Sequence, residues 1–72
     1  MIVELILKEQ TRLEFEGYEK IEFSSGVVFS NPVERRVEIV VKKHPDGRVS
    51  VFTDNSEIIK KLSAEVIDIH VK

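Results

Sequence analysis

The chain of 72 residues contains no cysteine and no tryptophan, and it has only three glycines and two prolines. Without cysteine it has no disulfide to staple a small fold and no thiolate for metal binding or nucleophilic catalysis. Gly17, Gly26 and Gly47 are too far apart to form a phosphate-cradling loop. The serines of Ser24-Ser25-Gly26 lack the strand-to-helix elbow of a hydrolase nucleophile. We therefore expect neither an enzyme nor a bound cofactor.

Long apolar runs are also missing, since none approaches the roughly 20 residues that a membrane-spanning helix needs. Met1 leads directly into a strand-like segment, without a basic leader or a small-residue cleavage site. We therefore expect a cytoplasmic protein that makes no contact with membranes. Eleven valines, eight isoleucines and ten glutamates against one glutamine are compatible with a thermophilic source.

The length predicts a single domain over residues 1–72. A domain of this size buries only about 60% of the surface that its unfolded chain exposes. With 42% apolar residues and no disulfide, its stability must come from close packing, surface ion pairs or self-association.

The clearest pattern is a β-hairpin between residues 36 and 53. Pro45 pre-sets φ for a turn, Asp46 can bond back to the backbone, and Gly47 accepts a positive φ. This chemistry predicts a type I turn followed by a glycine bulge. The loop length sets the register, in which Val40 faces Phe52.

Alternation divides this hairpin into two faces. We expect the first face to be buried against a core; it carries Val37, Ile39, Val41, Val49, Val51 and Thr53. The second face is mixed, because Arg36, Glu38 and Lys42 accompany the Val40–Phe52 pair. An aromatic ring beside a branched side chain predicts that something covers this face.

The remaining strands are predicted from alternation and turn residues. Ile2–Lys8 and Val27–Ser30 are expected to be strands, and Glu65–Lys72 is expected to be the last. Residues 12–16, and the segment that follows Gly17-Tyr18, predict a second hairpin; its inward side chains would be Leu13, Phe15, Ile21 and Phe23.

A short helix is expected at about residues 55–63. Asp54 with Glu57 three residues later predicts its cap, and Ser56 is the alternative cap. The fold class is α+β, predominantly antiparallel β: a small curled or barrel-like sheet of about six strands with one short helix before the last strand.

Six apolar side chains fall on second faces of these strands: Ile2, Ile6, Val28, Val40, Phe52 and Val66. One short helix cannot cover them all, so the sheet must close into a barrel, fold over as a sandwich, or pair with another copy. We therefore expect a non-enzymatic binding or assembly domain that forms a homodimer. Its predicted interface residues are Val40, Phe52 and Tyr18, the aromatic placed at a turn.

The net charge of −2 is unevenly distributed: residues 1–34 carry −4, residues 35–48 carry +3, and residues 49–72 carry −1. The basic residues of the hairpin region are Arg35, Arg36, Lys42, Lys43 and Arg48. They suggest an alternative, a nucleic-acid-binding module using residues 35–48. We favour self-association, because Lys42 and Lys43 point to opposite faces and the rest of the chain is acidic.

Two carboxylate–imidazole pairs have metal-ligand spacing, Asp68 with His70 and His44 with Asp46. A metal site needs three or more converging ligands. Since each pair supplies two, we expect no metal.

Overall fold

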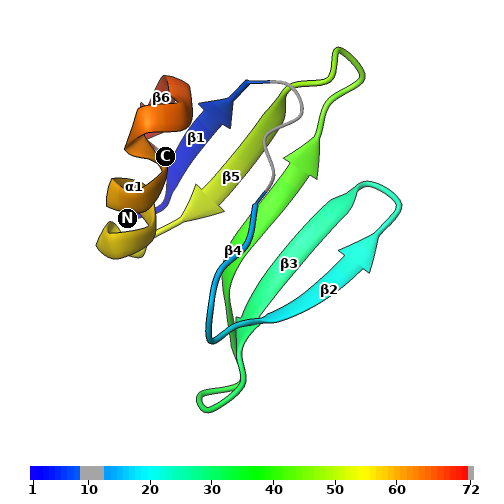
Figure 1. The fold of residues 1–72 in the computed structure, drawn as a ribbon, viewed down its shortest axis with the longest axis vertical. Coiled ribbons are helices and arrows are strands. Elements are labelled where there is room, and N and C mark those ends of the chain that lie inside the picture. Colours follow the sequence, from blue (N-terminus) through cyan, green and yellow to red (C-terminus); the bar gives the residue numbers. More distant parts are fainter. Residues whose placement is uncertain (9–12, 72) are drawn as a thin grey trace.

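The computed structural model describes residues 1–8 and 13–71. They form one antiparallel sheet of six strands with a single short α-helix before the last strand (Figure 1), so the predicted α+β class is confirmed. The elements are β1 (Val3–Leu7), β2 (Glu19–Phe23), β3 (Gly26–Asn31), β4 (Arg36–Lys43), β5 (Val49–Thr53), α1 (Ser56–Leu62), the 3₁₀ turn η1 (Ser63–Glu65) and β6 (Val66–Val71).

The strand order is β2-β3-β4-β5-β1-β6, and every neighbouring pair is antiparallel. The chain passes from β2 to β5 through adjacent hairpins, and α1 then carries it to the far side of β1. The described strands therefore make an open sheet with β2 and β6 at its edges, and they do not close into a barrel.

The hairpin of β4 and β5 has the predicted turn and register. The Gly47 N–H donates to the His44 carbonyl at 3.0 Å, and the His44 N–H donates to the Arg48 carbonyl at 2.9 Å. Gly47 has φ of 91°, a left-handed conformation that costs little without a Cβ. As expected, Val40 lies opposite Phe52.

The predicted second hairpin is wrong. Residues 13–16 form no strand, and β2 pairs instead with β3 across the tight turn at Ser24-Ser25. Ile21 and Phe23 are 45% and 57% exposed, so they do not point into the core. Alternation within each segment was a correct observation, but it does not determine which segments pair.

The helix cap also differs from the prediction. Asn55, rather than Asp54 or Ser56, has the extended cap conformation, and its Oδ1 accepts from the backbone N–H groups of Glu57 at 2.9 Å and Ile58 at 3.4 Å. Lys60 and Lys61 lie in the last turn, where positive charge is favourable.

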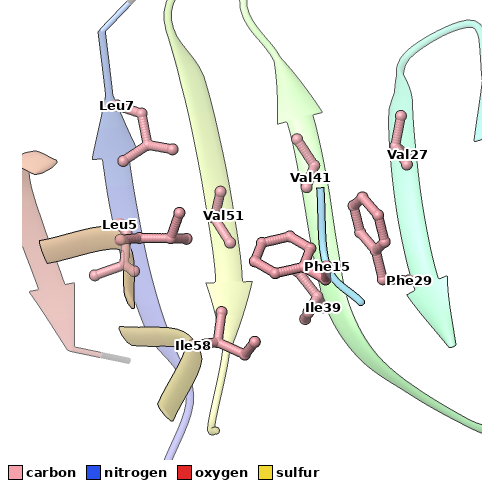
Figure 2. Close-up of a cluster of buried hydrophobic side chains, with 10 residues drawn as sticks. Leu5, Leu7, Phe15, Val27, Phe29, Ile39, Val41, Val51 and Ile58 are labelled. Carbon is pink, nitrogen blue, oxygen red and sulfur yellow. The ribbon is translucent and has the colours of Figure 1, made fainter. Parts of the chain in front are cut away.

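The core lies between one face of the sheet and a cover made by α1 and residues 13–18 (Figure 2). Its buried apolar residues are Leu5, Leu7, Phe15, Val27, Phe29, Ile39, Val41, Val51, Ile58 and Leu62.

Two predicted face assignments, those of Val37 and Val66, are wrong. Val37 is 51% exposed near the start of β4, beside a bulge in the β3–β4 pairing, and Val66 pairs with Leu7 and packs on this core, so it does not lie on the second face.

Candidate interaction surface

The sheet has a second face, opposite α1 and residues 13–18, which we call the open face. The strand register places its side chains in two rows that each cross all six strands. The first row is Ile21, Val28, Val40, Phe52, Glu4 and His70. The second row is Phe23, Gly26, Lys42, Ser50, Ile6 and Asp68.

The apolar part of the open face covers β2 to β5. In the first row, Val28, Val40 and Phe52 are half-buried and Ile21 is exposed. In the second row, Phe23 is 57% exposed. Two aromatic rings and three further apolar side chains therefore lie at adjacent positions, so they form one continuous patch and are not scattered surface residues.

Two further features of this patch involve the Phe52 ring. The Lys42 ammonium lies 5.4 Å from the centre of its ring, within the range of a cation–π contact. A shallow hollow of about 120 Å³ lies beside the ring; Val40, Phe52 and Ile2 are among its lining residues. The predicted interface residues Val40 and Phe52 are therefore neighbours on one surface.

The other end of the open face is mostly polar. Glu4 on β1 and both Asp68 and His70 on β6 occupy three of the last four positions of the two rows, and the half-buried Ile6 on β1 occupies the fourth. Asp68 Oδ2 and His70 Nε2 are 3.0 Å apart, and both side chains are exposed. The face therefore divides into a mainly apolar region on β2 to β5, which also holds Lys42 and Ser50, and a mainly polar region on β1 and β6, which also holds Ile6.

Tyr18, the third predicted interface residue, lies away from the two rows. Its half-buried ring packs on the core and meets the Phe15 ring edge-on, with centroids 6.5 Å apart. Its hydroxyl accepts a hydrogen bond from Asn55 Nδ2 at 3.3 Å. Desolvation, with a hydrogen bond to Glu38 as the next cause, raises the pKa of Tyr18 above 10.0.

The basic residues of the hairpin region do not converge on one surface. Arg36 donates to Glu38 at 3.0 Å, and this contact lowers the pKa of the Glu38 carboxyl. Arg48 pairs with Asp46 at 2.8 Å. Further members are spread apart, because Lys42 lies on the open face, Lys43 lines a cleft on the opposite face, and Arg35 sits in the β3–β4 turn with φ of 54°.

The histidine, serine and carboxylate side chains bear on catalysis and metal binding. His44 Nε2 and Ser50 Oγ are 2.6 Å apart, but Ser50 is fully buried and its hydroxyl therefore has no access to a substrate. Within residues 1–8 and 13–71 no three histidine or carboxylate side chains gather in a way that could hold a metal ion.

Sequence reasoning missed Ile21 and Phe23 as members of the open face. Their alternation was visible, but the face they occupy depends on pairing with Val28 and Gly26, which only the register reveals.

No helix in the described residues is long and apolar enough to cross a membrane. Comparison with protein-family models, curated proteins and solved structures finds no match to this chain.

Proposed function

We propose that this chain is a non-enzymatic, cytoplasmic assembly domain that forms a homodimer through the open face. One observation carries the proposal: apolar side chains occupy adjacent positions on four neighbouring strands, and no helix in the described part of the chain lies over them. Burial of such a patch is favourable at roughly 25 cal/mol per Å² of apolar surface removed from water. A small domain without disulfides gains stability in this way.

The composition of the patch fits a protein partner. It holds Phe52 beside Val40 and Val28, and aromatic residues are enriched at protein interfaces. Its margin holds Lys42 on one side and the polar end formed by β1 and β6 on the other. An apolar centre with a charged margin is the usual arrangement of residues at a protein interface.

The alternative, nucleic-acid binding by residues 35–48, has less support. Two arginines already pair with carboxylates of the same hairpin region, Arg36 with Glu38 and Arg48 with Asp46. An arginine that contacts a phosphate would first have to leave its carboxylate, and the free energy lost in breaking that ion pair would reduce the net binding free energy. A titration with single-stranded and double-stranded oligonucleotides at two salt concentrations addresses this alternative, since phosphate contacts give a steep salt dependence.

Sedimentation equilibrium of the wild type and of Phe52→Glu tests the proposal. We expect a dimer at high micromolar concentration for the wild type and a folded monomer for Phe52→Glu, because burial of an unpaired carboxylate within the contact costs a large amount of free energy. Val71→Glu is the matched control. Val71 is 62% exposed and pairs with Val3 on the side of the sheet that faces α1, so this variant should remain a dimer.

A wild type that remains a monomer at high micromolar concentration would overturn the proposal. The same holds if Phe52→Glu and Val71→Glu dissociate to the same degree, because the effect would then not depend on the face. Circular dichroism of each variant establishes that it is folded before its mass is interpreted.

A further inference from the structure

The order of side chains on the open face restricts how two copies can meet. We propose that they pack face to face about a two-fold axis that runs parallel to the strands between β3 and β4. This inference rests on the proposed self-association and specifies its geometry. A two-fold contact uses the same surface on both copies, so that surface must complement itself when the strand order is inverted.

The first row meets this requirement by its symmetry. From β2 to β5 it reads Ile21, Val28, Val40 and Phe52: a large, a medium, a medium and a large apolar side chain. Inversion about the β3–β4 boundary places Val28 against Val40 of the second copy and Ile21 against its Phe52. Every position in the row then meets an apolar side chain.

The second row adds less to this match, because two of its four positions are already covered within one copy. From β2 to β5 it reads Phe23, Gly26, Lys42 and Ser50. Gly26 and Ser50 are buried, and His44 Nε2 lies 2.6 Å from the Ser50 hydroxyl. Only Phe23 and Lys42 of this row are therefore available to the second copy, and the Lys42 stem can lie along it while the ammonium reaches water at the margin.

Axes at other positions match the face poorly. A two-fold axis along β5 would set β6 of one copy over β3 of the other, with Asp68 and His70 near Val28, and would leave β2 without a cover. The axis between β3 and β4 covers β2 to β5 and leaves β1 and β6 outside, so Glu4, Asp68 and His70 stay in water, and the half-buried Ile6 is the one apolar side chain of the two rows that stays outside the contact. Sheets packed in this way lie about 10 Å apart with nearly aligned strands.

Thiol crosslinking tests this geometry directly, since the chain has no cysteine of its own. Two single variants, Ile21→Cys and Phe52→Cys, are prepared separately, mixed in equal amounts and treated with a bismaleimide whose short spacer spans the roughly 10 Å between packed sheets. In a dimer of one variant with itself, the two cysteines are displaced sideways by three strands, roughly 14 Å at the usual strand spacing, in addition to the gap between the sheets, and the spacer does not reach. We expect a crosslinked dimer in the mixture and none in either variant alone.

A second variant keeps the inference testable if Phe52→Cys weakens the dimer. Ile21→Glu changes a 45% exposed residue of the edge strand β2, where a carboxylate is compatible with folding. The axis between β3 and β4 predicts that this variant is a monomer in sedimentation, because Ile21 then lies inside the contact. An axis along β5 predicts that it remains a dimer.

The possible results separate the geometry from the proposed function. A wild-type dimer combined with crosslinking of Phe52→Cys to itself, or with a dimeric Ile21→Glu, would overturn the axis and leave self-association intact. A monomeric wild type would overturn both.

Discussion

The Tyr18 hydroxyl accepts a hydrogen bond from the side-chain amide of Asn55, a residue 37 positions away in the chain, at 3.3 Å. The same amide group caps α1 through its oxygen. One side chain therefore starts the helix and joins it to the segment that covers the core. The hydroxyl also bonds the Glu38 carboxylate, so the contact extends to β4.

Tyr18→Phe should lower the free energy of unfolding by about 0.5–1.5 kcal/mol for each of the two hydrogen bonds that the hydroxyl makes, because it keeps the ring and removes the hydroxyl. Urea denaturation measures the change. Asn55→Asp is the informative companion, since it retains an oxygen for the cap and loses the amide donor to Tyr18. If Tyr18→Phe is as stable as the wild type, the hydroxyl does not hold the helix to this segment.

Glu38 should make stability dependent on pH in the acidic range. The hydrogen bond from Arg36 is the main cause that holds the pKa of this carboxyl below its ordinary value of 4.5, and Tyr18 and Asn31 also bond it. A carboxyl with a lowered folded-state pKa stabilises the fold fully above the unfolded value, and this contribution disappears as the pH falls through the lowered value. The urea midpoint should therefore decline below about pH 4.5.

Glu38→Gln separates this group from the other carboxyls. Asp46, whose pKa is lowered chiefly by the Arg48 backbone N–H, remains in the variant and contributes below its ordinary value of 3.8. The decline between pH 5 and pH 4 should be smaller in Glu38→Gln than in the wild type. Identical pH profiles for the two proteins would show that Glu38 makes no such contribution.

Asp68 protects the edge strand β6 against pairing with a strand of another molecule. Asp68 Oδ1 accepts from the backbone N–H of Ile69 at 2.9 Å, so this N–H is not available to an incoming strand. The carboxylate adds a charge on an edge where Ile67 and Ile69 are 48% and 52% exposed. Native proteins commonly place charges on exposed edges for this reason.

Asp68→Ala should therefore aggregate at a lower protein concentration than the wild type, as measured by light scattering during a concentration series. His70→Ala is the control, because it leaves the Asp68 carboxylate on the Ile69 N–H. Equal scattering by Asp68→Ala and the wild type would mean that the edge is protected in another way.

Local chemistry was sufficient to predict part of this fold. The turn at Pro45-Asp46-Gly47 determines the register of β4 and β5, and that register in turn predicted the Val40–Phe52 pair. Strand pairing across larger separations was not predictable in the same way. Residues 13–16 alternate like a strand, yet they pack Phe15 on the core without joining the sheet.

The candidate surface was predicted in part for the same reason. Val40 and Phe52 belong to a hairpin whose loop is three residues long, so their position followed from the turn. Ile21 and Phe23 belong to a strand whose partner was misassigned, and they were expected inside the core.

The Asn55 cap was missed because Asp54, Asn55 and Ser56 are all good caps, and only the backbone conformation distinguishes them.

The central claim is that the open face is buried between two copies of this chain. Isotope-filtered nuclear Overhauser spectroscopy on a mixture of labelled and unlabelled protein tests it most directly, because it detects only contacts between chains. We predict intermolecular contacts between the methyl groups of Val28 and Val40 and between Ile21 and the Phe52 ring. Intermolecular contacts confined to other surfaces, or none at a concentration where sedimentation finds a dimer, would contradict the account.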